Sequence, residues 1–143
     1  MTRAVFDSTV LISAFLRPAG LSDELLSLAV EGSFVLLLSP DILSETWRKL
    51  LTSTRLQTRY RYTDERAHSF CRGILRICEI IREVPPLTGV VRDPTDDMVV
   101  ACAVAGRANR IVTRDKDLLS IGSYQEIVMN TPEEFRGLLR QNV

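Results

Sequence analysis

The stretch "DPTDDMVVACAVAGRANRIVTRDKDLL", residues 93–119, carries the signals of a helix, a strand and a further helical turn in immediate succession. Its acidic head is typical of a helix start. Asp93 suits the N-cap, Pro94 suits the first helical position, and Asp96 at the third favours the positive end of the helix dipole. The run "NRIVT" (109–113) then predicts a short strand. A helix that leads directly into a strand indicates an α/β chain.

Asp97 is harder to explain as part of a helix start. Its helical neighbours three, four and seven positions on are Val100, Ala101 and Val104, so it shares their inward stripe. A buried carboxylate needs a partner, which is a cation, a metal ion or several hydrogen-bond donors. No Lys or Arg lies within one helical turn on the C-terminal side. We therefore expect the partner of Asp97 to come from elsewhere in the chain.

Strand-like and helix-like runs alternate along the chain. The predicted strands cover residues 3–6, 33–38, 80–84, 109–113 and 126–129. The predicted helices cover residues 9–16, 22–32, 39–51, 63–79, 93–106, 115–120 and 131–140. Ser39 suits an N-cap, and Thr131 with Glu134 forms a capping box. This alternation predicts a single α/β domain over residues 1–143, a three-layer α/β/α sandwich with a mainly parallel sheet.

Two of the predicted strands end beside an acid. Asp7 directly follows the first strand, and Asp115 lies two residues beyond strand 109–113. In sheets of this kind ligands bind at the carboxyl ends of the strands, so these acids and those before helix 93–106 should form a cluster. Two carboxylates about 4 Å apart repel by about 4 kcal/mol at an effective dielectric constant near 20. A divalent cation removes that cost, and oxygen ligands suit Mg²⁺ or Mn²⁺.

The composition is that of an ordinary globular protein. Hydrophobic residues make up 45% of the 143 residues, and 18 Lys and Arg balance 18 Asp and Glu, so net charge gives no hint of a polyanion partner. Asp7 interrupts the apolar N-terminal run, which predicts a cytoplasmic protein with no membrane segment. Cys71, Cys78 and Cys102 form no C-x-x-C pair and His68 is the sole histidine, which favours reduced thiols over a zinc site.

Four stretches together resemble the PIN domain family. In chain order they are "VFDSTVLISAFL" (5–16), "SPDILSETWRKLL" (39–51), the stretch 93–119 and "EIVMNTPEEF" (126–135). The similarity is greatest to single-domain PIN proteins that act as toxins of toxin–antitoxin pairs. The resemblance implies an α/β/α sandwich and a metal-dependent endoribonuclease that uses Mg²⁺ or Mn²⁺. It also implies an RNA substrate, an antitoxin from a separate chain and a homodimer.

The resemblance assigns roles to particular residues. The implied catalytic residues are Asp7, Ser8, Glu45, Asp97, Thr113 and Asp115. Of these, Asp7, Glu45, Asp97 and Asp115 would ligate metal, and Asp96 could reach a second ion. Glu45 is a site residue through the resemblance alone, because its helical position opposite the apolar stripe predicts a solvated residue paired with Lys49. Asp117 is interpreted as the start of a helical turn.

One position departs from the family pattern. The family often has Asp-Thr-Asn after the first strand, whereas this chain has Asp7-Ser8-Thr9. Thr9 replaces an amide that helps to order the acids and solvent. The alternative function is therefore a catalytically weak PIN-like domain that serves as an RNA-binding or protein-interaction module. A receiver-type signalling domain fits less well, because its expected lysine is absent at Arg114.

A basic segment could hold the phosphates that an acidic pocket repels. The predicted RNA contacts are Arg48, Lys49, Arg55, Arg59 and Arg61, with Arg114 beside the last acid. Tyr60 and Tyr62 are interleaved with these residues and could stack on unpaired bases. The alternative is a solvated helix face whose tyrosines belong partly to the core.

Overall fold

A six-stranded sheet runs through the centre of the molecule in the computed structural model, which describes residues 1–141. Residues 142–143, the end of the predicted domain, lie outside the described part. The strands are β1 (Arg3–Phe6), β2 (Val35–Leu38), β3 (Cys78–Ile80), β4 (Arg110–Val112), β5 (Ser123–Tyr124) and β6 (Ile127–Asn130). Their order across the sheet is β3-β2-β1-β4-β6-β5, and only the pairing of β5 with β6 is antiparallel.

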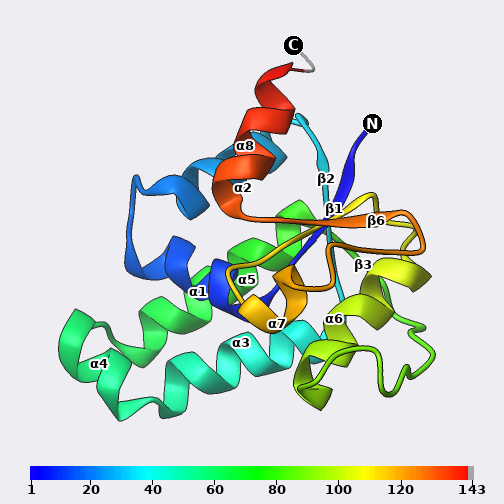
Figure 1. Ribbon diagram of the computed structural model, residues 1–143. Helices are drawn as coiled ribbons and strands as arrows, with labels where there is room; N and C mark the ends of the chain where they lie inside the picture. Colours follow the sequence, from blue (N-terminus) through cyan, green and yellow to red (C-terminus); the bar gives the residue numbers. More distant parts are fainter. Residues whose placement is uncertain (142–143) are drawn as a thin grey trace.

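Helices cover both faces of this sheet (Figure 1). They are α1 (Ser8–Leu16), α2 (Leu21–Val30), α3 (Pro40–Thr52), α4 (Thr54–Tyr60), α5 (Asp64–Ile77), α6 (Pro94–Ala105), α7 (Lys116–Leu119) and α8 (Pro132–Gln141). Contacts join α1, α2, α3, α5 and α8 into one layer, whereas α6 packs on β1, β2 and β4. Right-handed crossovers explain this division, because the chain moves one way across the sheet before β3 and the opposite way after it. The predicted α/β/α sandwich is therefore confirmed.

The sequence located most elements to within a few residues, including the caps. Ser39 accepts a hydrogen bond from the amide of Ile42, and Thr131 and Glu134 exchange the two bonds of a capping box. The strand predicted at 80–84 is wrong in position, because β3 begins at Cys78 and ends at Ile80. Helix α4 and strand β5 were not predicted. None of the helices found in residues 1–141 has the length and apolar character to cross a membrane.

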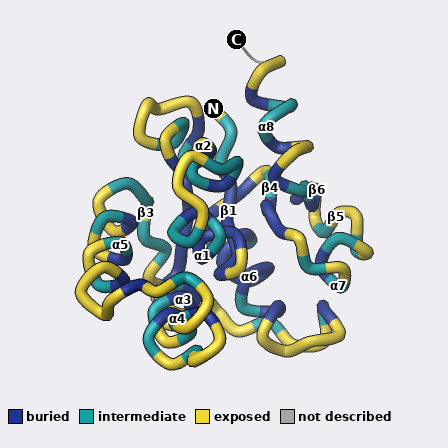
Figure 2. Tube along the Cα trace, turned by 90° about the vertical axis from the view of Figure 1, so that its left-hand side faces the viewer, coloured by how far each residue is buried: buried dark blue, intermediate teal, exposed yellow. Residues whose placement is uncertain are grey.

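The core fills both sides of the sheet, and Figure 2 shows β1 and β4 mostly in the dark blue of buried residues, whereas the edge strands β3 and β5 are partly exposed. Three aromatic rings anchor the α2 and α8 side. Phe135 of α8 packs edge-on against Phe6 and Phe34, with ring centroids 6.0 and 4.9 Å apart. A second cluster lies under α3, α4 and α5, where the buried Tyr62 hydroxyl donates a 2.6 Å bond to the Leu50 carbonyl. These two clusters fix the helices that carry the residues around the strand ends.

The three cysteines are free thiols, as the sequence predicted. Cys71 and Cys102 are buried, Cys78 is half-buried, and all three are free. Burial raises the pKa of the Cys71 and Cys78 thiols to about 11 and that of Cys102 to about 12, so all three stay protonated near neutral pH.

Truncation of Phe135 tests the importance of the aromatic cluster. Phe135→Ala should lower the free energy of unfolding by about 3–5 kcal/mol, because a fully buried ring leaves a cavity. Chemical denaturation measures this change. Leu75→Ala is the control, because Leu75 is 44% exposed on α5 and its loss should cost less than about 1 kcal/mol. Equal losses in the two variants would contradict the proposed role of Phe135.

Candidate active site

Two strand ends form the base of the candidate site. Strands β1 and β4 are neighbours in the sheet, so Asp7 after β1 and Asp115 beyond β4 emerge at the same edge. The buried Thr113 hydroxyl donates to Asp7 Oδ2 and accepts the amide of Asp115 at 2.9 Å. Asp7 Oδ1 also accepts the amide of Val10 at 3.0 Å and so caps α1. The placement expected for Asp7, Thr113 and Asp115 is therefore observed.

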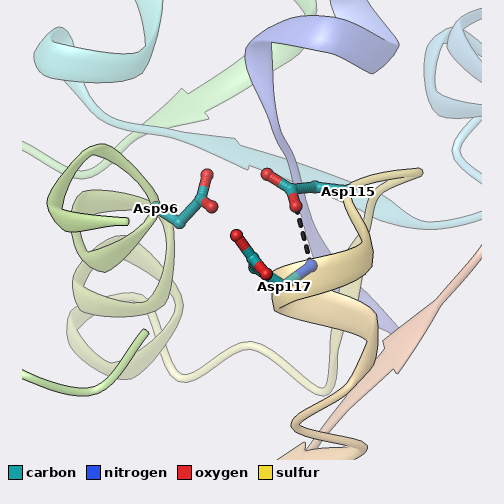
Figure 3. Close-up of side chains that lie close together, drawn as sticks. All are labelled: Asp96, Asp115 and Asp117. Atoms are coloured by element: carbon teal, nitrogen blue, oxygen red, sulfur yellow. Dashed lines mark hydrogen bonds between the residues drawn. The ribbon is translucent and has the colours of Figure 1, made fainter. Parts of the chain in front are cut away.

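Asp96 supplies the third acid from the first turn of α6. Its side chain is only 9% exposed, and within residues 1–141 its Oδ2 atom has no hydrogen-bond partner. Figure 3 shows the Asp96 carboxylate directed at those of Asp115 and Asp117. Ligand oxygens of these three residues lie within 4.8 Å of one another, close enough for one cation to bind them together. A buried carboxylate normally has a hydrogen-bond donor or a cation as its partner, so the free Asp96 oxygen is a candidate ligand for a cation.

Asp117 is a member of this cluster that the sequence did not predict. It lies in the first turn of α7, as interpreted, and its amide donates to Asp115 Oδ1 at 2.8 Å. That short turn folds back and brings the Asp117 carboxylate towards Asp96, as Figure 3 shows. The sequence signal that could have indicated this placement is the second acid, two residues after Asp115.

Asp97 does not point at the acidic cluster, which corrects the expectation that it would share a cation with Asp7 and Asp115. Its Oδ1 accepts the amides of Val90 and Val91 at 3.1 and 2.7 Å, and its Oδ2 accepts the amide of Gly89 at 3.2 Å. Consecutive helical residues point about 100° apart, so Asp96 and Asp97 face different surroundings. The partner of buried Asp97 is thus a set of donors from the loop before α6.

Glu45 on α3 faces the same cleft from the other side. Its side chain is 11% exposed and forms the predicted pair with Lys49, with Nζ and Oε1 3.1 Å apart. Lys49 Nζ also donates to the buried Ser8 hydroxyl at 3.2 Å. Glu45 therefore both forms an ion pair with Lys49 and lines the acidic cleft. The acidic cleft has a volume of about 380 Å³ and is bordered by Asp7, Ser8, Thr9, Glu45, Arg48, Lys49, Asp93, Thr95, Asp96, Val99 and Asp115.

Burial and mutual repulsion favour the protonated form of two acids in this cleft, Asp7 and Asp96. Desolvation raises the pKa of Asp7, although bonds from Thr113, Val10 and Thr9 oppose the shift. Desolvation also raises the pKa of Asp96 to about 7, helped by the close approach of the Asp115 carboxyl group and by the charges of nearby carboxylates. An acid with a pKa near neutral is common at functional sites.

The predicted RNA-contacting residues separate into different surroundings. Arg48 and Lys49 border the acidic cleft, whereas Arg55, Arg114 and again Lys49 line a neighbouring groove. The Arg59 guanidinium lies 5.5 Å from the centre of the Tyr60 ring, and Arg61 ends α4 in the left-handed conformation with φ of 51°. The tyrosines also separate, because Tyr62 is buried in the core and Tyr60 lines the groove.

Comparisons with known proteins agree with this architecture. Residues 3–117 match the PIN domain family. The chain is 31% identical to an uncharacterized protein of Methanocaldococcus jannaschii, MJ1680, over 93% of this chain and 88% of that protein. The fold is similar to a chain in the crystal structure of VapBC2 from Rickettsia felis bound to a DNA fragment from their promoter. That match has a TM-score of 0.64 and 17% identity, and it covers 91% of this chain and 98% of the other.

Replacement of Asp96 by asparagine should change the stability of the protein in a way that depends on pH. The unfolded Asp96 side chain titrates near 3.8 and the folded one at about 7, so its charge lowers the free energy of unfolding as pH rises through that window. Relative to wild type without metal, Asp96→Asn should therefore gain about 2 kcal/mol between about pH 4 and pH 8. This gain is roughly half the value of a three-unit shift, because solvent screens part of the charge.

Asp97→Asn is the matched control at the adjacent position. It removes a carboxylate that accepts three amides, so it should lower the free energy of unfolding at about pH 8 by about 1–3 kcal/mol. Denaturation at both pH values in EDTA measures both effects. Destabilisation by Asp96→Asn at the higher pH would contradict the described environment of Asp96.

Proposed function

This chain belongs to the PIN domain family, whose members are generally nucleases, and from that premise we propose that it is a metal-dependent endoribonuclease. The observation that carries the proposal is the buried, unpartnered Asp96 oxygen facing Asp115 and Asp117 at the carboxyl ends of β1 and β4. Carboxylate oxygens in this number and charge suit Mg²⁺ or Mn²⁺.

The acids of the cleft have distinct proposed roles. Asp96, Asp115 and Asp7 would hold the cation, with Asp117 as a further ligand and Glu45 as a direct or water-mediated one. A cation bound there would lower the pKa of the attacking water and offset negative charge on the phosphoryl oxygens. Thr113 fixes the orientations of Asp7 and Asp115 through its two hydrogen bonds. Asp97 acts through the loop that precedes α6 and is a positioning residue.

The basic side chains at the cleft would bind the RNA backbone. Lys49 lies between Glu45 and Ser8, so its ammonium group is within the cleft that the scissile phosphate must enter. Arg48 borders the same cleft on the exposed face of α3. Both can offset the repulsion between phosphate and the acids. We assign Arg59 and Arg61 to weaker, long-range attraction of RNA.

The toxin role and its partner are part of the same proposal. The structural likeness to VapBC2, a toxin–antitoxin complex, supports an antitoxin from a separate chain. An acidic cleft of this kind would accept a basic side chain from such a partner. A small open reading frame beside the gene would support the pairing. The proposal includes a homodimer, as the resemblance implies.

An RNA cleavage assay with neighbouring substitutions tests the enzyme and its site together. Wild type should cut labelled RNA internally in Mn²⁺ or Mg²⁺ and not in EDTA. Asp96→Asn should lower the rate about a hundredfold or more, because it removes a charge that balances the cation. Asp97→Asn should keep most of the activity at a temperature where it is folded.

Two outcomes would change the conclusion. Loss of cleavage in Asp97→Asn with activity kept in Asp96→Asn would indicate that Asp97, and not Asp96, binds the metal. A folded wild type that binds RNA but never cleaves it would favour the alternative, a catalytically weak binding module.

A further inference from the structure

A second hollow lies directly beside the acidic cleft. It has a volume of about 460 Å³ and is formed by side chains of α1, α3, α4 and the segments around them. Thr9 and Lys49 belong to both hollows, so the two are continuous. We call this hollow the basic groove, because its charged lining residues are Arg17, Lys49, Arg55 and Arg114. Its size lies within the range of about 300–1,000 Å³ that small-molecule sites occupy.

The positive charge of the basic groove is only partly balanced. No acidic residue lines it. Lys49 is paired with Glu45, and Arg114 forms two bonds to the Glu133 carboxylate at 3.0 and 2.7 Å. Among residues 1–141, Arg17 and Arg55 form no ion pair. The groove therefore holds two guanidinium groups that are free to bind an anion.

These two arginines converge on Tyr60. Both arginines line the groove together with Tyr60, and the nearby Arg17 guanidinium lowers the pKa of the Tyr60 hydroxyl, with the charges of Arg59 and Arg55 adding to that effect. Like charges gathered around one hydroxyl repel each other, and an anionic ligand would relieve that repulsion. The Tyr60 ring is half-buried, so part of it remains available for contact with a ligand.

The remaining surface of the groove suits a flat apolar group. Ile12, Leu16 and Leu56 line it beside Tyr60. An aromatic ring over an aliphatic floor, with guanidinium groups at its edge, matches a nucleobase and its phosphate. We propose that the basic groove binds an unpaired nucleotide adjacent to the phosphate cleaved in the acidic cleft, with its base against Tyr60 and its phosphate at Arg17 and Arg55. This inference rests on the proposed nuclease function and names its substrate as single-stranded RNA.

Charge and continuity favour RNA over a protein in this groove. A partner that inserted a basic side chain would be drawn to the acids of the cleft and repelled by Arg17 and Arg55. Thr9 and Lys49 line both hollows, so a strand whose phosphate occupies the cleft can leave it over these two residues and enter the groove. A duplex would not free its bases to contact Tyr60, so an unpaired strand is required.

Binding measured without cleavage tests the groove independently of the enzyme activity. The probe is a fluorescein-labelled single-stranded RNA of about six nucleotides, followed by anisotropy in EDTA. Tyr60→Leu should weaken binding about tenfold, whereas Tyr60→Phe should stay within about twofold because the ring is kept. Arg17→Gln and Arg55→Gln should each weaken binding about fivefold and reduce the salt dependence by about one counterion. A duplex of the same sequence should bind more weakly than the single strand.

Arg140→Gln is the matched control, because it removes the same charge from an exposed position on α8. Its binding should equal that of wild type. Wild-type affinity in folded Tyr60 and arginine variants would overturn the groove assignment, and the proposed nuclease would still stand if Asp96→Asn abolished cleavage. Equal displacement of the probe by poly-glutamate and by unlabelled RNA would also overturn it, because an acidic polypeptide would then be the favoured occupant.

Discussion

Repulsion among carboxylates at one edge of the sheet is the constraint on which the rest of the site depends. Strand order alone brings Asp7 and Asp115 together, because β1 lies beside β4. The buried Thr113 hydroxyl donates a hydrogen bond to the Asp7 carboxylate and accepts one from the backbone amide of Asp115, so it stabilises the charge of Asp7 and holds the Asp115 backbone in place. Nothing comparable satisfies Asp96 among the described residues, so its pKa rises to about 7. The fold keeps the acids close, and within residues 1–141 no Lys or Arg side chain forms an ion pair with Asp7, Asp96 or Asp115, so a cation would relieve their repulsion.

The neighbouring acids of α6 show how one helix turn can serve two purposes. Asp96 faces the cleft, whereas Asp97 ties three amides of residues 89–91 to the start of α6. Asp97 therefore stabilises the loop before α6 and the first turn of α6, which is the turn that positions Asp96. The sequence predicted that Asp97 is buried and needs a partner. It could not say that the partner is backbone, because amide donors have no sequence signature.

Other features were predictable to the extent that their signals are local. The acids after β1 and β4, the caps at Ser39 and Thr131, and the mainly parallel sheet implied by α/β alternation all follow from short patterns or from the PIN resemblance. Helix α4 was missed because its one buried apolar residue gives no periodicity, although Ser53 caps it. The place of Asp117 was missed because it depends on how α7 folds back towards α6, which no local pattern encodes.

A chain with 18 acidic and 18 basic residues can still present two strongly charged surfaces, because the fold separates the signs. Acids gather at the strand ends. In the neighbouring hollow, Arg17 and Arg55, which form no ion pair among residues 1–141, lie around Tyr60. Lys49 stands at the boundary, paired with Glu45 on one side and lining the groove on the other. Cleavage of a phosphodiester here would need both surfaces, since the acids would hold a cation that activates the attacking water and the basic side chains would hold the strand that the acids repel. Net charge therefore says little about the ligand, whereas the adjacency of the acidic cleft and the basic groove is the feature that supports the proposed nuclease function.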